Sequence, residues 1–313
     1  MSRPKFHARD RSRRIRIATA AVILVWLSQV TPLIVPACLA APQAPEKDKK
    51  PKNRSLRWSP PALDSPVPSL QASPPCALAK VLDQAGARAI EMVTDLQNFT
   101  AREKIQYQTS DLQNFVKDFG SETFDYIVAF GPLEKGLTVQ ENRNPTHGSS
   151  LSRAATQDMG LPEMLLIFLP KMQEDYEMRC EGSVEWNGQL TWVVRFEQRH
   201  EKPSRTFSFH IDKKVFPAPL EGRAWIASDS GEIVHMDTGL MEEVPAVRVR
   251  HWYLSIEYAP VQFQSQPVKI WLPQMVDGYC DYGDHRTIVY HTFSDFFLFS
   301  VETNQKIEKP KQP

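Results

Sequence analysis

Hydrophobic and polar residues alternate along most of the chain after residue 98. The clearest example is residues 222–240, GRAWIASDSGEIVHMDTGL, in which two alternating stretches flank a turn sequence at 228–231. Gly231 supplies the positive φ that such a turn often needs. Alternation with period two is typical of strands that bury one face, so the pattern predicts an antiparallel sheet. Similar stretches occur at residues 98–109, 122–130, 137–143, 191–197, 206–211, 251–258, 268–272, 286–292 and 296–301.

The alternation also assigns the residues of this predicted hairpin to its two faces. Val234, Met236 and Leu240 are expected on the apolar face, and Ile233, His235 and Asp237 on the opposite face. No third polar residue completes a catalytic arrangement with His235 and Asp237. We therefore interpret the hairpin as a structural landmark and His235 as an exposed or hydrogen-bonded structural residue.

Two stretches have helical spacing instead. Apolar residues recur every three or four positions from Leu78 to Leu96, which predicts an amphipathic helix, and Ser73 is expected to cap it with Pro74 at the first position. Residues 161–170 are apolar nearly all round and predict a second helix that ends at its proline. Two helices are too few to cover a long flat sheet. The sheet must therefore curl around them. The predicted fold class is α+β, with a curved antiparallel sheet wrapped around about two helices.

The beginning of the chain has the form of a secretory signal. Residues 1–16 contain seven Lys or Arg and one Asp, and residues 17–40 carry no charge and end in small residues. This order predicts a signal peptide over residues 1–41, cleaved after Ala40 or Ala41. A retained membrane anchor is the alternative, although a proline interrupts an apolar run that barely reaches the ~20 residues needed to span a bilayer.

Export would place the protein in the periplasm or at the outer membrane. Residues 35–38 resemble a lipoprotein signal that attaches lipid to Cys38, although the proline in it fits that signal poorly. Membrane contact is expected only through the signal or through such an anchor. Residues 42–75 contain nine prolines and predict a disordered linker. The folded domain is predicted over residues 76–305, with a disordered tail at 306–313.

The charge balance excludes one class of partner. Outside residues 1–40 the chain has 30 Lys or Arg and 36 Asp or Glu, so its body is mildly acidic. Nucleic-acid binding needs clustered basic residues that neutralise phosphates. We therefore expect no nucleic-acid partner.

Three cysteines remain outside the predicted signal, at positions 76, 180 and 280. They form no Cys-x-x-Cys motif, so neither a zinc ribbon nor a thioredoxin-like redox site is indicated. Exported proteins favour disulfides, Cys76 starts the predicted domain, and Cys180 lies in a predicted strand. We predict that Cys76 and Cys180 form a disulfide and that Cys280 stays free. Three buried, reduced cysteines are the alternative.

The sequence offers no established catalytic or cofactor motif. It contains no Gly-x-Ser-x-Gly, His-Glu-x-x-His, P-loop or Gly-x-Gly-x-x-Gly pattern. Asp281, Asp284, His285 and His291 form the polar cluster that best suits a divalent metal ion, but Asp is also an ordinary residue of β-turns. His285 and His291 would lie ~20 Å apart on an extended strand, too far to share one ion. We expect no metal, no cofactor and no enzymatic activity.

Two stretches resemble a known family. Residues 222–236, GRAWIASDSGEIVHM, and residues 268–273, VKIWLP, are similar to strands of the periplasmic lipoprotein-carrier (lipoprotein-localisation factor) superfamily. The resemblance covers about residues 77–305 and extends to secreted bacterial proteins of unassigned function with this general shape. It implies an unclosed β-barrel with helices as a lid, around an apolar cavity that holds acyl chains of lipoproteins or other lipids. The proline-rich linker, the cysteines and the polar segment 144–160 depart from the family pattern.

The large residues on the predicted apolar faces admit two interpretations. They fill a core, or they line a cavity for a hydrophobic ligand, and the scarcity of helices favours a cavity for the set as a whole. We predict a non-enzymatic cell-envelope protein that binds a lipid or acylated protein. The alternative is a structural or interaction module with a filled core and an envelope protein partner, and a hydrolase using residues 281–291 is least favoured. The predicted cavity residues are Phe124, Tyr126, Leu165, Phe168, Trp192, Phe196, Phe207, Phe209, Trp252, Leu254 and Ile256.

Overall fold

The computed structural model describes residues 58–71, 76–96, 98–131, 139–146, 161–211, 214–263 and 269–299. The strands in these ranges are β1 (Asn98–Asp111), β2 (Val116–Phe130), β3 (Val139–Pro145), β4 (Tyr176–Trp186), β5 (Gln189–Gln198), β6 (Ser208–Ile211), β7 (Lys214–Pro217), β8 (Leu220–Ala227), β9 (Ile233–Leu240), β10 (Val249–Gln262), β11 (Lys269–Tyr282) and β12 (His285–Leu298). The helices are α1 (Leu78–Asp95), α2 (Leu161–Leu165) and α3 (Pro170–Gln173), with 3₁₀ turns η2 (Leu166–Phe168) and η3 (Pro245–Val247).

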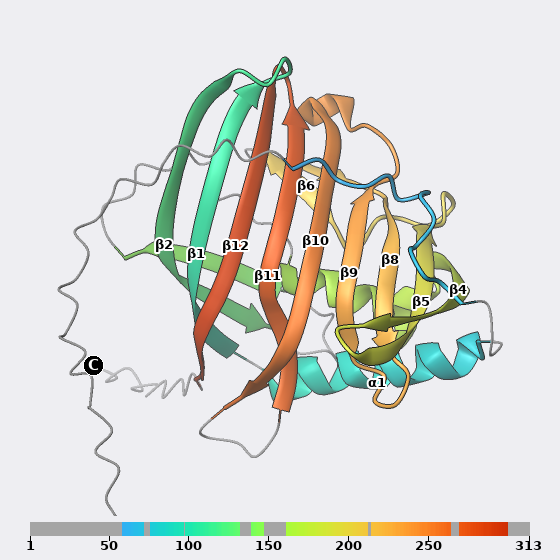
Figure 1. Cartoon of the computed structure of the whole chain (residues 1–313). Coiled ribbons are helices and arrows are strands. Elements are labelled where there is room, and N and C mark those ends of the chain that lie inside the picture. The colour runs from blue at the N-terminus through green and yellow to red at the C-terminus, as the bar shows by residue number, and fades with distance from the viewer. Residues whose placement is uncertain are drawn as a thin grey trace, which may run out of the picture. The chain divides into compact units, whose positions relative to one another are not determined.

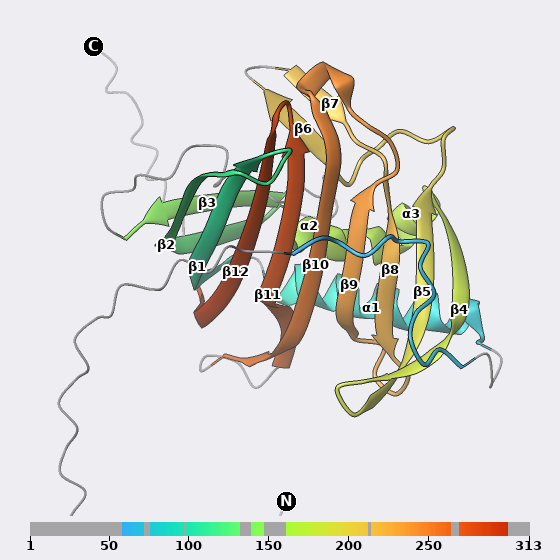
Figure 2. The same ribbon diagram turned by 45° about the horizontal axis from the view of Figure 1, so that its top comes forward.

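Ten of the described strands form one curved sheet that does not close (Figure 1). Their order is β3-β2-β1-β12-β11-β10-β9-β8-β5-β4, all neighbours are antiparallel, and β6 pairs with β7 apart from the sheet. Helix α1 passes across one face, behind β11 to β4 (Figure 2). The predicted curved antiparallel sheet around helices is confirmed. Because the described helices after α1 are short, the term α+β describes the fold only approximately.

The main core lies between the helices and the inner face of the sheet, which we define as the face toward α1. Val81, Ala85, Ala89, Met92 and Val93 are buried along α1 at helical spacing. Alternating strand residues pack in the same core, as the pattern in the sequence predicts. They include Val194, Phe196, Ala224, Ile226, Trp252, Leu254 and Ile256.

The predicted hairpin at residues 222–240 is formed by β8 and β9, and Gly231 in its turn has φ +75°. Two face assignments in it are wrong, since Ile233 lies in the main core and Val234 lies on the outer face. Trp225 pairs with His235 and Ile226 with Ile233, so β9 carries Val234 as one extra residue, a β-bulge. The bulge turns Val234 to the outer face, where it packs with Trp225.

The face of β5 and β8 that points away from α1 is also covered. The alternating pattern instead predicted that one face of the sheet is exposed. Residues 58–71, called the outer segment from this point on, run across the strands on the face opposite α1 (Figures 1 and 2). Arg195 donates hydrogen bonds to Asp64 Oδ1 (3.0 Å) and the Leu63 carbonyl, and Arg223 donates to the Ser65 carbonyl (2.9 Å). For residues 58–71, the predicted disordered linker is therefore wrong. The large apolar residues of this segment pack on the sheet despite its prolines; they are Trp58, Leu63, Val67 and Leu70.

Several element boundaries also differ from the predictions. Helix α1 begins at Leu78 with Ala77 at its N-cap, so the cap predicted at Ser73 is wrong. The predicted helix over residues 161–170 is divided into α2 and η2, and Leu169 is extended before α3 begins at Pro170. Strand β11 continues through Pro273 because the register with β10 shifts there, and a bulge tolerates a residue without an N–H donor.

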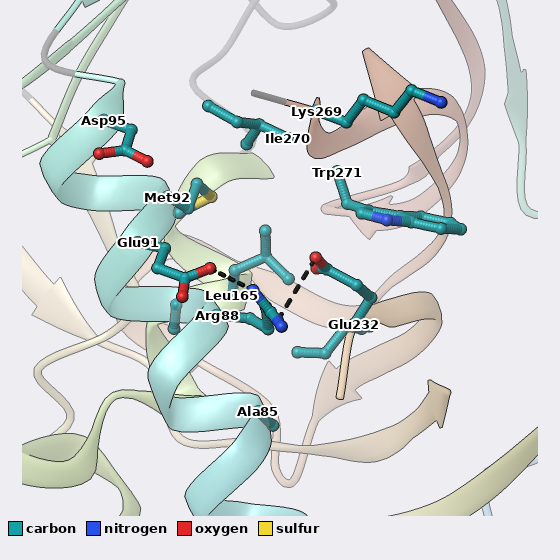
Figure 3. Close-up of a pocket in the computed structure, with 12 residues that line it drawn as sticks. Ala85, Arg88, Glu91, Met92, Asp95, Leu165, Glu232, Lys269, Ile270 and Trp271 are labelled. Atoms are coloured by element: carbon teal, nitrogen blue, oxygen red, sulfur yellow. Dashed lines mark hydrogen bonds and ion pairs between the residues drawn. The ribbon is translucent and has the colours of Figure 1, made fainter. Parts of the chain in front are cut away.

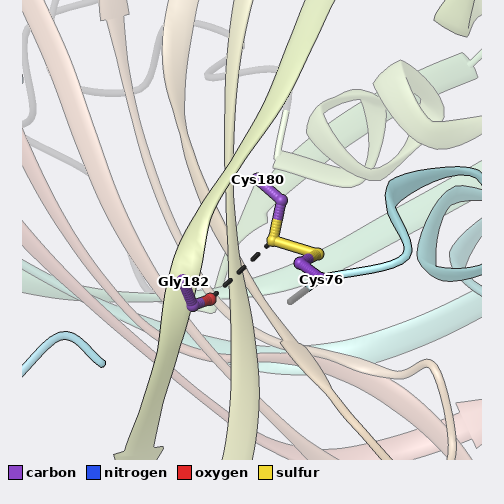
Figure 4. Close-up of a disulfide and its surroundings, with 3 residues drawn as sticks. All are labelled: Cys76, Cys180 and Gly182. Atoms are coloured by element: carbon purple, nitrogen blue, oxygen red, sulfur yellow. Dashed lines mark hydrogen bonds between the residues drawn. A yellow bond between two sulfur atoms is a disulfide. The ribbon is translucent and has the colours of Figure 1, made fainter. Parts of the chain in front are cut away.

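The predicted disulfide between Cys76 and Cys180 is confirmed (Figure 4). Their Cα atoms lie 6.2 Å apart, and the bond joins the segment before α1 to the edge strand β4. Cys280 is the free cysteine of the described residues and is partly buried. Burial raises the pKa of its thiol to about 12, which keeps the thiol protonated and unreactive at neutral pH.

Some predictions concern residues outside the described ranges. They are the signal peptide at 1–41 with its alternative lipid anchor at Cys38, the linker at 42–57 and 72–75, and the tail at 306–313. These stay predictions. None of the helices in the described ranges has the length and apolar character needed to cross a membrane.

Candidate functional site

Two small pockets lie between the helices and the inner face of the sheet, the first with both apolar and charged lining residues and the second almost wholly apolar. The first pocket lies under the second half of α1 and encloses about 40 Å³ (Figure 3). A cavity of this size holds about one to three water molecules. Its lining residues are Ala85, Arg88, Ala89, Glu91, Met92, Asp95, Leu165, Glu232, Ile233, Lys269, Ile270 and Trp271.

The second pocket encloses about 10 Å³ and is lined almost wholly by apolar and aromatic side chains. It shares Met92 and Leu165 with the first pocket, so the two pockets are neighbours and these two side chains border both. Both are unbranched at Cβ and able to change rotamer, and methionine is the more adaptable of the two. The other lining residues are Phe99, Tyr126, Phe130, Pro162, Leu272, Pro273, Phe293 and Phe296.

Charged residues form one rim of the first pocket. Arg88 lies between Glu91 and Glu232 (Figure 3), pairs with both, and donates a hydrogen bond to the Ser230 carbonyl (3.0 Å). Burial raises the pKa of Glu232 to about 7, against the opposing effect of Arg88. The rim is therefore close to a change of charge at neutral pH, whereas the pocket floor is apolar.

The first half of α1 is attached to the residues around α3 by hydrogen bonds and close packing. Gln173 donates hydrogen bonds from Nε2 to the carbonyls of Leu82 (3.1 Å) and Phe168 (2.7 Å). A Cβ at Gly86 would lie 3.1 Å from the Phe168 carbonyl oxygen, so glycine permits this close approach. The disulfide at Cys76 adds a covalent attachment just before the helix.

The predicted cavity residues are largely brought together, but few of them line a pocket. Tyr126 and Leu165 line the second pocket, and Leu165 also lines the first. Trp192 is partly buried against the main core, and Phe124 is buried beside β1 and β3. The other predicted residues are buried in the main core and are not among the lining residues; they are Phe168, Phe196, Phe207, Phe209, Trp252, Leu254 and Ile256.

The polar cluster predicted near residues 281–291 is dispersed. Asp281 binds Arg286, which donates from Nε to Oδ1 at 2.8 Å, and His291 binds Glu103 from another strand. Burial raises the pKa of Asp281, but hydrogen bonds and charge from Arg286 outweigh it and lower that pKa. Within the described residues, no group of three metal-ligating side chains comes together.

His235 is buried on the outer face and hydrogen-bonded, in agreement with its interpretation as a structural residue. Its ring stacks on Trp186, Nε2 lies 3.1 Å from Asp237 Oδ1, and Nδ1 lies 3.0 Å from Glu257 Oε1. Burial lowers the pKa of His235, but the hydrogen bonds to both carboxylates outweigh it and raise the pKa to about 9. His235 is thus an imidazolium at neutral pH, enclosed by two carboxylates.

Comparison with known proteins finds likenesses only among solved structures. No protein-family model matches the chain, and no curated protein matches it in sequence. A DUF1329 family protein from Desulfovibrio piger is 9% identical, with a TM-score of 0.39, over 74% of this chain and 96% of that one. A putative outer membrane lipoprotein-sorting protein domain from Vibrio parahaemolyticus is 13% identical, with a TM-score of 0.38, over 72% and 95%. A LolA superfamily protein from Nitrosomonas europaea is 9% identical, with a TM-score of 0.32, over 71% and 94%.

Two of these structures are a lipoprotein-sorting protein domain and a LolA superfamily protein, but at TM-scores below 0.5 the likeness does not assign this chain to their superfamily. Likenesses at this level concern the arrangement of the chain and assign no function.

Proposed function

We propose that this chain is a non-enzymatic cell-envelope protein that binds an apolar chain between α1, α2 and the inner face of the sheet. The observation that carries the proposal is the pair of neighbouring pockets that share Met92 and Leu165 in their linings. If these two side chains turn aside, the pockets join into one elongated apolar space. The polar rim at Arg88 and Glu232 lies at one end of it.

Burial of apolar surface would drive the binding of such a chain. Each buried methylene contributes about 0.8 kcal/mol, so a twelve-carbon chain gains up to about 9 kcal/mol before ordering costs. The pockets of about 40 and 10 Å³ are too small for such a chain as they stand. Binding therefore requires Met92 and Leu165 to move, and part of the gain is spent on that movement.

The proposed location follows from two independent features. The basic and then apolar start of the sequence is typical of an export signal. Disulfides such as Cys76–Cys180 persist in oxidising compartments and are rare in the cytosol. Both support the periplasm or the outer membrane.

A second candidate function is supported by the small size of the pockets. A filled interior suits a structural or interaction module that carries no ligand and binds an envelope protein. The two functions differ in what the purified protein contains and in what it takes up.

One experiment separates the two candidates. The full chain is purified mildly after export, native mass spectrometry records any bound lipid, and the delipidated protein is titrated with diphenylhexatriene, an uncharged apolar fluorophore. We expect one saturable site that weakens at least about tenfold in Ala89→Leu, which places extra carbon atoms in the first pocket. Ala87→Leu makes the same change on the exposed side of α1 and should leave the affinity unchanged. No bound lipid and no saturable uptake would refute the proposal in favour of the filled module.

A further inference from the structure

Four charged or titratable side chains form a buried network on the inner face of the sheet, outside the two pockets. They come from β1 (Glu103), β3 (Glu141 and Arg143) and β12 (His291), and none is more than 3% exposed. Arg143 donates to Glu103 through Nε (2.7 Å) and Nη2 (3.2 Å), and its Nη1 lies 3.4 Å from Glu141. His291 Nδ1 lies 2.7 Å from Glu103 Oε1. We call these four residues the buried polar cluster.

The charges of this cluster do not favour an anion. Glu103 and Glu141 carry two negative charges against one positive charge on Arg143, and His291 adds a positive charge only when protonated. Burial raises the pKa of Glu103, but Arg143 and His291 outweigh it and lower that pKa, so the carboxylate stays ionised. A further negative group placed here would meet two buried carboxylates at low dielectric.

One ring nitrogen in the cluster has no assigned role. Nε2 of His291 is buried and has no hydrogen-bond partner among the described residues. Leaving a buried polar atom unsatisfied costs about 1–3 kcal/mol, so such atoms need an explanation. Nδ1 on the other side of the ring lies beside Glu103, which also binds Arg143 and so attaches the edge strand β3 to β1. Nε2 takes no part in these contacts.

The cluster adjoins the second pocket through an aromatic wall. Tyr126 and Phe293 both line that pocket, and their rings lie 5.3 Å apart. The guanidinium of Arg143 lies 4.9 Å from the ring centre of Tyr126, and the ring of His291 stacks on Phe293 at 6.3 Å. A ligand group at the Tyr126–Phe293 side of the second pocket would thus lie next to the cluster.

We propose that the buried polar cluster recognises the uncharged hydroxyl head group of an amphiphile whose apolar chain occupies the joined pockets, with His291 Nε2 as the atom that binds the hydroxyl. The inference rests on the proposed function and names its ligand class. A hydroxyl both donates and accepts, so it pairs with Nε2 in either protonation state of the ring. A carboxylate head group would be disfavoured by Glu103 and Glu141.

The test compares three probes with the full chain, each below the concentration at which it aggregates. They are 1-monododecanoylglycerol, dodecanoate with the same acyl chain, and diphenylhexatriene with no head group. We expect the wild type to bind the monoacylglycerol at least about tenfold more tightly than dodecanoate. In the same samples, the ¹⁵N signal of His291 Nε2 should shift on saturation with the monoacylglycerol.

Two variants separate head-group binding from a purely structural role. His291→Asn places an amide nitrogen near the position of Nδ1, which retains a donor to Glu103 and removes Nε2. It should lose the tenfold preference and keep its affinity for diphenylhexatriene. His291→Gln places an amide near the position of Nε2 and should retain part of the preference. Circular dichroism checks that both variants fold.

The outcomes distinguish this inference from the proposed function. Uptake of diphenylhexatriene together with equal or tighter binding of dodecanoate would overturn the head-group assignment and leave the apolar site intact. The same conclusion follows if the Nε2 signal does not move at saturation. Failure of all three probes to bind would overturn both.

Discussion

Replacing Cys76 and Cys180 with serine removes the covalent tie between the start of α1 and β4. The two cysteines are 104 residues apart in sequence, and closing a loop of that length stabilises by about 4–5 kcal/mol in the chain-entropy model. The variant should therefore lose about that much free energy of unfolding. With a urea m-value of roughly 2–3 kcal/mol per M, the midpoint should fall by roughly 1.3–2.5 M.

Urea titration followed by tryptophan fluorescence measures this change, and the wild type with and without a reductant gives an independent comparison. Cys280→Ser is the matched control, because that thiol forms no disulfide. Its midpoint should stay close to that of the oxidised wild type and should fall as the wild type does when the Cys76–Cys180 bond is reduced. A double variant within about 1 kcal/mol of the oxidised wild type would refute the reasoning. It would show that the reduced chain is already restrained or that the bond strains the fold.

Three further predictions concern other parts of the sheet. Because the pKa of His235 is raised to about 9, its protonated ring stabilises the folded state fully below pH 6.5, and this stabilisation is lost as the pH rises through about 9. Urea titrations should therefore show the wild type losing about 3 kcal/mol of unfolding free energy over this pH window relative to His235→Gln. A pH-independent difference between the two proteins would contradict this. A Cβ at Gly222 would lie 2.2 Å from the carbonyl oxygen of Asp237, so Gly222→Ala should destabilise by about 1–3 kcal/mol or more in thermal unfolding, and an unchanged melting temperature would be against it. Arg143→Met leaves the Glu103 carboxylate buried without its guanidinium partner and should lower the free energy of unfolding by about 3–5 kcal/mol. Adding Glu103→Gln should restore part of this loss, and no restoration would contradict a structural role for the pair.

The fold could be predicted from the sequence wherever the burial of one face set the pattern. The alternation in β10 placed Trp252 and Leu254 on the inner face correctly, because a strand with one apolar side has only one acceptable orientation. The assignment failed at Val234, since a bulge adds a residue that the pattern does not reveal. It also failed on the outer face, where the burial of Trp225 depends on the outer segment, which lies far away in sequence.

The site was less predictable for a geometric reason. Sequence shows that Met92 belongs to the apolar side of α1, but not that the helix leaves a gap at that position. Whether a buried residue fills the core or borders a pocket depends on how elements from distant parts of the chain pack. The buried polar cluster is the extreme case. Glu103 and His291 are 188 residues apart, and each looks like an isolated polar residue in a strand.

The most direct test of the central claim is the position of a bound apolar chain. A monoacylglycerol with a diazirine at the end of its chain is bound to the full protein, irradiated, and located by peptide mass spectrometry. We predict crosslinks in the peptides that contain Met92, Leu165 and Ile270, reduced by Ala89→Leu and unchanged by Ala87→Leu. Crosslinks confined to exposed residues such as Phe115 and Phe119, or none at all, would contradict it.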